Sequence, residues 1–130
     1  MQQVRYNWLF DATYKLAQSS SYKRFRVGAI IARKNKILSM GTNAKKSHPL
    51  QAKFTCRPFL NAWRHAEIHS LSLCRLCDIE GADVYVGRVL ADGSWANSRP
   101  CTGCLEALKY FDVRGMYYHQ DGSFYYEAVN

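Results

Sequence analysis

The chain has 130 residues, of which 48% are hydrophobic and 22% are charged. These proportions exclude a disordered protein and fit one globular domain over residues 1–130. No apolar run approaches the roughly 20 residues that a membrane-spanning helix needs, and the first residues lack the apolar stretch of a signal peptide. The five cysteines are an odd number and cannot all pair within one chain. They therefore favour free or metal-bound thiols and a cytoplasmic protein.

The net charge of +8 is unevenly distributed along the chain. Residues 12–66 contain no Asp or Glu but carry twelve Lys and Arg residues. Charge of one sign on part of a surface attracts anions, so a ligand that bears phosphate, either a nucleotide or a polynucleotide, is one interpretation. A solvated basic face that only promotes solubility is the other.

The first half of the chain predicts one helix, a hairpin and a long loop. Val4, Trp8, Leu9, Ala12 and Leu16 recur at helical spacing, which predicts a helix that ends near residues 18–21. Two short apolar runs, 27–32 and 37–40, are separated by polar residues and predict a β-hairpin. Residues 43–61 are basic, contain two prolines and show no clear period, as is typical of a functional or mobile loop.

The second half alternates between helices and strands. Helical spacing returns over residues 62–76 and again over 101–111, and the segments 83–90, 116–119 and 124–126 predict strands. The last two strands are joined by a turn that contains Asp121-Gly122, a strong hairpin signal, and must be antiparallel because four residues cannot form a crossover. This alternation predicts an α/β sandwich built on one sheet.

Two short motifs lie at the predicted starts of the second and third helices. The first is His65-Ala66-Glu67, and the second is Pro100-Cys101 followed by Cys104. Side chains two residues apart on a helix point to opposite sides, so His65 and Glu67 can meet a common target only beyond the helix N-terminus. Cys101 and Cys104 share one face of a first turn, where the helix dipole favours thiolates.

One imidazole and two thiolates would give zinc three ligands and leave a fourth position open to water. Zinc in such a site lowers the pKa of its water from about 16 to about 7. Glu67 would then be free to move a proton from that water to a ring nitrogen, which leads to hydrolytic deamination. A structural zinc site without catalysis and a core without metal are the alternatives.

The combination of His-x-Glu with Pro-Cys-x-x-Cys resembles the signature of the zinc-dependent cytidine and deoxycytidylate deaminase superfamily. The resemblance implies a three-layer α/β/α sandwich around one mixed five-stranded sheet. It also implies that His65, Cys101 and Cys104 bind Zn²⁺ and that Glu67 is the proton shuttle.

The same resemblance implies a set of substrate contacts. Asn43 would contact the sugar, the backbone N–H of Ala66 would bind the base carbonyl, and Ser98 and Arg99 would lie at the mouth of the pocket. An Asn that caps a turn and an arginine that is merely exposed are the alternatives for Asn43 and Arg99.

The expected reaction is the conversion of cytosine to uracil in a free nucleoside or nucleotide, with adenine as the other candidate base. Basic residues around Arg26, Lys45, Lys46 or Arg99 would contact a 5′-phosphate. The alternative is a deaminase of single-stranded DNA or RNA, in which Phe54, Phe59 and Trp63 would stack on bases. A zinc-stabilised binding module without catalysis is a third hypothesis. Relatives commonly assemble, so the resemblance also implies a homo-oligomer.

Other residues that could carry chemistry have structural interpretations. Cys74 and Cys77 form a second Cys-x-x-Cys inside a predicted helix, and buried thiols are favoured there over a second metal site. His69 follows His65 by one turn and is expected to be a satisfied histidine rather than a ligand. Tyr117, Tyr118, Tyr125 and Tyr126 are typical of aromatic packing on strands.

Overall fold

The computed structural model describes residues 1–22, 25–45, 49–54 and 64–130. Within these residues, seven strands form one sheet in the order β1-β7-β6-β4-β2-β3, and β5 pairs with β4. The strands are β1 (Gln2–Val4), β2 (Arg26–Arg33), β3 (Lys36–Thr42), β4 (Asp83–Val89), β5 (Trp95–Ala96), β6 (Gly115–Gln120) and β7 (Ser123–Ala128). The helices are α1 (Trp8–Gln18), the 3-10 helix η1 (Pro49–Lys53), α2 (Ala66–Leu73), α3 (Leu76–Ile79) and α4 (Thr102–Tyr110).

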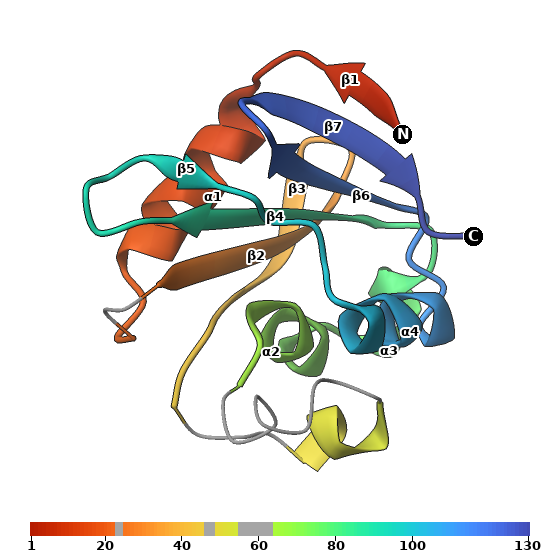
Figure 1. The fold of residues 1–130 in the computed structure, drawn as a ribbon. Coiled ribbons are helices and arrows are strands. Elements are labelled where there is room, and N and C mark those ends of the chain that lie inside the picture. Colours follow the sequence, from red (N-terminus) through yellow and green to blue (C-terminus); the bar gives the residue numbers. More distant parts are fainter. Residues whose placement is uncertain (23–24, 46–48, 55–63) are drawn as a thin grey trace.

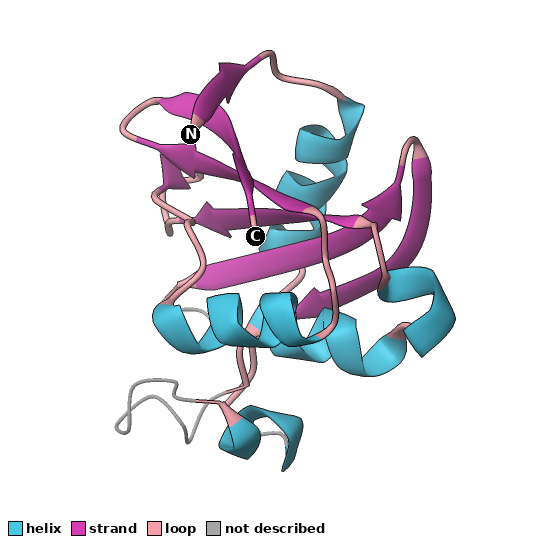
Figure 2. Ribbon diagram, turned by 90° about the vertical axis from the view of Figure 1, so that its right-hand side faces the viewer, coloured by secondary structure: helices cyan, strands magenta, loops and turns pink. Residues whose placement is uncertain are grey.

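Helices cover both faces of the sheet, as Figures 1 and 2 show: α1 lies on one face, and α2, α3 and α4 lie on the other. The central strand β2 explains this arrangement, because its side chains alternate between two cores. Ala29 and Ile31 belong to the core under α2 and α4, whereas Ile30 and Ala32 pack in the core with α1. The predicted three-layer α/β/α sandwich is confirmed.

The sheet is mixed. Strands β4 and β6 are parallel and are connected through α4, whereas the other pairs are antiparallel. The predicted hairpin of β6 and β7 forms, and Asp121 and Gly122 adopt the positive φ angles of 49° and 84° that a tight hairpin turn requires.

Seven strands are present in the described residues instead of the predicted five. The additional strands are β1 and β5, which have three and two residues. Elements this short carry no detectable periodicity of their own and are held by their partners β7 and β4.

Two predicted helix boundaries are wrong. The first helix begins at Trp8, because the side chain of Asn7 caps it by accepting a hydrogen bond from the N–H of Leu9 (2.9 Å), whereas Val4 pairs with Phe124 in the sheet. The second helix starts at Ala66 and stops at Leu73, since Cys74 and Arg75 adopt extended backbone conformations before α3 begins.

The break after Leu73 separates the two cysteines that the sequence placed in one helix. Cys74 lies at the C-cap of α2, where it is half-buried and packs against the core. It joins no group of three or more His, Cys, Asp or Glu side chains in the described residues. The side chain of Cys77 lies outside the described part of the structure.

Close packing against the sheet fixes the position of α2. A Cβ atom at Gly41 in β3 would lie 2.5 Å from the backbone nitrogen of Ser70 and 2.8 Å from the carbonyl oxygen of Ala66. Only glycine allows this approach, which sets the N-terminal end of α2 against the sheet. In the described residues, no helix combines the length and the apolar character that crossing a membrane requires.

Candidate active site

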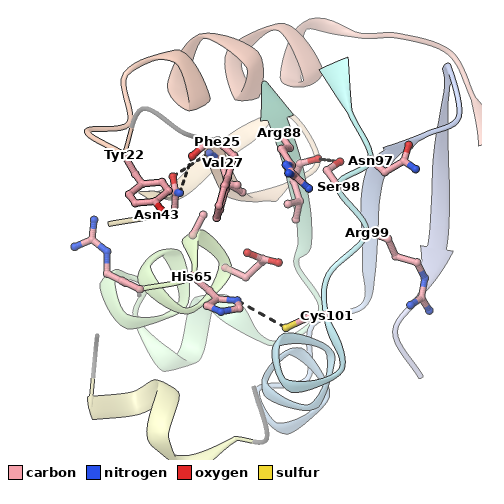
Figure 3. Close-up of a pocket in the computed structure, with 14 residues that line it drawn as sticks. Tyr22, Phe25, Val27, Asn43, His65, Arg88, Asn97, Ser98, Arg99 and Cys101 are labelled. Atoms are coloured by element: carbon pink, nitrogen blue, oxygen red, sulfur yellow. Dashed lines mark hydrogen bonds between the residues drawn. The ribbon is translucent and has the colours of Figure 1, made fainter. Parts of the chain in front are cut away.

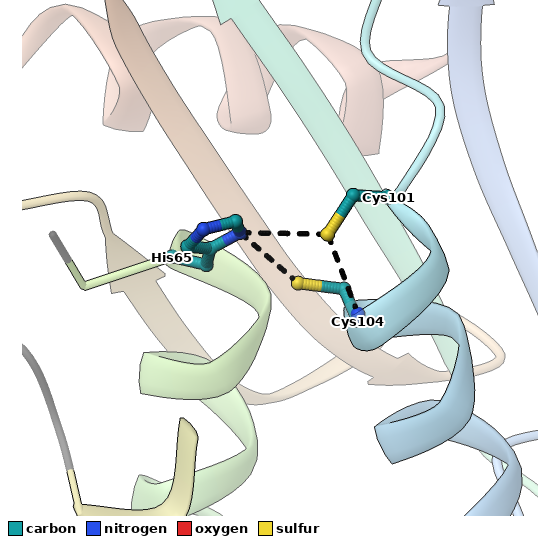
Figure 4. Close-up of side chains that lie close together, drawn as sticks. All are labelled: His65, Cys101 and Cys104. Atoms are coloured by element: carbon teal, nitrogen blue, oxygen red, sulfur yellow. Dashed lines mark hydrogen bonds between the residues drawn. The ribbon is translucent and has the colours of Figure 1, made fainter. Parts of the chain in front are cut away.

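The N-terminal ends of α2 and α4 converge on one spot, as predicted (Figures 1 and 4). His65 is the N-cap of α2, and Cys101 is the N-cap of α4, where its Sγ accepts a hydrogen bond from the N–H of Cys104 (3.5 Å). Gln51 of η1 is fully buried, and its Oε1 accepts the backbone N–H of His65 (2.8 Å). The loop before α2 therefore helps to hold the histidine in place.

The geometry of His65, Cys101 and Cys104 fits a zinc site. The Nδ1 atom of His65 lies 3.7 Å from Sγ of Cys101 and 3.3 Å from Sγ of Cys104, and the three ligand atoms lie within 4.8 Å of one another. Zn–S and Zn–N bonds of about 2.3 and 2.0 Å at a tetrahedral angle would separate sulfur from nitrogen by about 3.5 Å. Figure 4 shows both sulfurs turned toward the imidazole.

Three protein ligands leave one position of a tetrahedral zinc ion open. Within the described residues, no fourth His, Cys, Asp or Glu ligand atom joins the group. His69 instead uses Nδ1 to accept the backbone N–H of Thr42 (3.1 Å), in line with its expected structural role.

Glu67 lies in the pocket next to this group. Its side chain is buried, with 5% exposure, and it is the only carboxylate among the described residues that line the pocket. Burial raises the pKa of Glu67, and the nearby charge of His65 opposes that effect. The arrangement puts one proton-carrying group beside three metal ligands.

The pocket brings together most of the predicted site residues (Figure 3). It is lined by Tyr22, Phe25, Val27, Asn43, Arg64, His65, Ala66, Glu67, Val86, Arg88, Asn97, Ser98, Arg99 and Cys101. Ala66 is the first residue of α2, so its N–H belongs to the first turn, whose N–H groups have no acceptor inside the helix. Such an N–H can bind a carbonyl oxygen of a ligand.

Asn43 lines the pocket, but its side chain is also part of the framework. Its Oδ1 accepts hydrogen bonds from the hydroxyl of Ser20 (2.6 Å) and the N–H of Val27 (2.9 Å), and its Nδ2 donates to the carbonyl of Phe25 (3.0 Å). These contacts tie the end of β3 to the start of β2.

Ser98 and Arg99 lie at the pocket, and both have partners in the protein. The Ser98 hydroxyl donates to the carbonyl of Val86 (2.8 Å) and accepts the N–H of His119 (2.9 Å). Arg99 forms a bidentate ion pair with Glu127, at 3.1 and 2.8 Å, and in Figure 3 its guanidinium points away from His65.

Arg26 is not brought to the pocket. It projects from the strand position next to Val27, and its guanidinium donates to the carbonyl of Leu90 (2.9 Å). Because neighbouring strand residues face opposite sides of a sheet, Val27 reaches the pocket and Arg26 does not. The prediction that Arg26 contacts the substrate therefore has no support in the structure. Lys45 is exposed and does not line the pocket, and Lys46 lies outside the described residues.

Of the three aromatic residues proposed to stack on bases, only Phe54 belongs to the described part of the chain. Phe54 is half-buried and packs against the core and Tyr110, while Phe59 and Trp63 lie outside the described residues. Tyr117, Tyr118, Tyr125 and Tyr126 pack within and between the strands, as expected, and are not among the residues that line the pocket.

The sequence analysis did not identify Tyr22, Phe25, Arg88 and Asn97 as pocket residues, and it counted Arg64 only among the twelve basic residues of 12–66. Arg88 had a usable signal, because it follows the buried Val84 and Val86 at two-residue spacing on β4. The guanidinium of Arg88 lies over the ring of Phe25, 5.1 Å from its centre.

Comparisons with solved structures agree with this fold. Two structures of the dCMP deaminase from the cyanophage S-TIM5 share the fold. The apo form aligns with a TM-score of 0.54 and 23% identity over 86% of this chain and 82% of that chain. The complex with dCMP and dUMP aligns with a TM-score of 0.56 and 20% identity over 84% of this chain and 76% of that one.

Acinetobacter baumannii RibD has a TM-score of 0.50 and 21% identity, over 84% of this chain but 26% of its own. No curated protein sequence matches the chain. Residues 4–120 match the family described as the cytidine and deoxycytidylate deaminase zinc-binding region. Because this match spans most of the chain and the donor set fits zinc, the protein belongs to the cytidine and deoxycytidylate deaminase family, and its cofactor is Zn²⁺.

Proposed function

We propose that this protein is a hydrolytic deaminase that converts cytosine to uracil in a free nucleoside or nucleotide. The net reaction consumes one water molecule and releases one ammonia molecule. The observation that carries the proposal is the placement of the buried carboxyl group of Glu67 in the same pocket as His65 and Cys101. A purely structural zinc site has no use for such a group.

His65, Cys101 and Cys104 would hold the metal. When bound there, zinc supplies the Lewis acidity that makes water nucleophilic near neutral pH. Glu67 accepts a proton from the attacking water on a carboxylate oxygen and delivers a proton to the ring nitrogen beside the attacked carbon. It then assists protonation of the departing amine.

The remaining groups orient the base. The free N–H of Ala66 at the start of α2 would donate to the carbonyl oxygen of cytosine, a contact that adenine cannot offer. Ser98 acts through its backbone position, because its hydroxyl bridges Val86 and His119. Asn43 sets the position of Phe25 and Val27 in the pocket wall through its hydrogen bonds. Because it also lines the pocket, it would lie beside the sugar of a bound substrate.

The test is the substitution Glu67→Gln, which keeps the shape of the side chain and removes its ability to carry the proton. We expect the variant to keep one zinc ion per chain and to lose ammonia release by a factor of about 100 or more. Glu106→Gln is the control, because Glu106 is an exposed glutamate on α4 outside the pocket. A fully active Glu67→Gln variant would show that the assigned shuttle is wrong.

A panel of cytidine, deoxycytidine, their 5′-monophosphates and a labelled cytosine oligonucleotide tests the substrate class. Activity on the small molecules supports the proposal. Activity restricted to the oligonucleotide, with a steep decrease at high salt, would support the polynucleotide alternative instead. A cytoplasmic homo-oligomer remains our expectation, which rests on the odd number of cysteines and on the resemblance to the family.

A further inference from the structure

The pocket has more positive charge than its own residues neutralise. Among its described lining residues are three arginines, Arg64, Arg88 and Arg99, and one carboxylate, that of Glu67. Arg99 is paired with Glu127 at 2.8 Å, and the Nε of Arg64 donates to the carbonyl of Thr42 (3.1 Å). Arg88 takes part in no salt bridge within the described residues.

Strand register places Arg88 on the pocket face of the sheet. Val84 and Val86 point from β4 into the core under α2 and α4, and Arg88 is the next side chain on that face. It pairs with Val27 on one side and with Ala96 on the other. In Figure 3 it lies across the pocket from His65 and Cys101.

The guanidinium of Arg88 is held in place but incompletely satisfied. Its guanidinium carbon lies over the ring of Phe25, 5.1 Å from the ring centre, which is within the range of a cation–π contact. Its Nε is buried and has no hydrogen-bond partner among the residues that the structure describes, a condition it shares with the Nε of Arg26 outside the pocket. A buried N–H without an acceptor is destabilising. Arg88, unlike Arg26, lines the pocket, so a ligand oxygen that came within reach of its guanidinium could supply an acceptor.

We propose that Arg88 is a specificity-determining residue that binds the 5′-phosphate of the substrate, which is therefore a cytosine nucleoside monophosphate. This inference rests on the proposed function. A guanidinium donates two parallel hydrogen bonds to phosphate oxygens. A base bound at His65 and Cys101 would leave the sugar and its phosphate to extend toward the side of the same pocket where Arg88 lies. A terminal phosphate is favoured over an internal one, because Phe25 covers Arg88 on one face and a continuing strand would need an open path there.

The experiment compares the zinc-loaded wild type with Arg88→Gln, Arg88→Lys and the control Arg5→Gln, which removes an exposed arginine outside the pocket. Ammonia release is measured with deoxycytidine, cytidine, their 5′-monophosphates and a cytosine oligonucleotide. We expect Arg88→Gln to lower kcat/KM for the monophosphates by about 10-fold to 100-fold, the loss of a hydrogen bond to a charged group. The values for the nucleosides stay unchanged. Arg88→Lys retains only part of the preference, because an ammonium lacks the planar fork.

A binding measurement gives a second readout that does not depend on turnover. The product uridine monophosphate should raise the melting temperature of the wild type more than uridine does, and Arg88→Gln should abolish that difference. An equal loss of activity on nucleosides and monophosphates in Arg88→Gln would overturn the inference, as would a wild type that prefers nucleosides. The latter result would leave the proposed deaminase intact. If no substrate releases ammonia but the monophosphate effect on melting depends on Arg88, the proposed function fails and the phosphate site stands.

Discussion

Replacing Gly41 by alanine should displace α2, the helix that carries His65 and Glu67 at its N-terminal end. The new Cβ would lie 2.5 Å from the nitrogen of Ser70, about 0.9 Å short of the 3.4 Å at which ordinary contact begins. It would also lie 2.8 Å from the carbonyl oxygen of Ala66. Both atoms are backbone atoms of α2, so the helix itself must move away from the sheet. Overpacking of this kind costs about 1–3 kcal/mol, and we expect Gly41→Ala to lose about 3 kcal/mol of unfolding free energy.

The displacement should also reach the chemistry, because His65 and Glu67 lie at the N-terminal end of the same helix. A shift of about 1 Å in a catalytic group can lower the rate by about 100-fold. The assay is urea unfolding at a fixed zinc concentration, together with zinc content and ammonia release.

Gly122→Ala provides the matched control for Gly41→Ala. Gly122 has a positive φ of 84°, but a Cβ added there would have no atom within 4 Å. The substitution should therefore cost about 1 kcal/mol through backbone strain alone and leave zinc binding and activity intact. If Gly41→Ala is as stable and as active as Gly122→Ala, the close packing of β3 on α2 is not what positions the site.

Two further substitutions test the framework around the pocket. Asn43→Ala should lower the unfolding free energy by about 2–4 kcal/mol, because it leaves the N–H of Val27 and the carbonyl of Phe25 without their partner. If the variant instead keeps its thermal stability and has a raised KM, Asn43 acts as a substrate contact. The hydrogen bond from Arg99 lowers the pKa of Glu127 in the folded protein. The ionised carboxylate therefore stabilises the fold at pH values above its unfolded pKa of about 4.3. This stabilisation is lost as the pH falls through the lower pKa of the folded state. Both side chains are partly exposed, so Glu127→Gln should lower the unfolding free energy at pH 7 by about 0.5–1 kcal/mol. The urea midpoint of the variant should also decrease less than that of the wild type as the pH is lowered from about 6 to about 3. If the urea midpoints of wild type and variant decrease equally over this pH range, the ion pair of Arg99 and Glu127 is not the source of this stability.

The metal-binding motif could be predicted because its geometry is local. His65 and Cys101 are N-cap residues, and helix geometry alone fixes where Glu67 and Cys104 lie relative to them. What remained open was whether two helices whose first residues are 36 positions apart, Ala66 and Thr102, converge. The packing of α2 and α4 on the same face of the sheet provides the answer.

Apart from Arg88, whose spacing from Val84 and Val86 on β4 gave a signal, the pocket wall could not be predicted, since it depends on strand register. Arg26 is the first residue of β2, and Arg88 lies next to the last residue of the adjacent strand β4. In the sheet, Arg26 pairs with Val89 and Arg88 pairs with Val27. This difference of one position sends their side chains to opposite faces of the sheet. The break after Leu73 was hidden for a related reason: apolar residues of α3 such as Ile79 also face the core, so the helical spacing continues across two extended residues.

X-ray absorption at the zinc edge of the purified protein tests the central claim most directly. The account predicts one zinc ion per chain with two sulfur neighbours at about 2.3 Å and two nitrogen or oxygen neighbours at about 2.0 Å, one of which exchanges with solvent. Cys104→Ser should remove one of the sulfur neighbours. A zinc ion surrounded by four protein ligands, or a protein that binds no zinc, would contradict the account.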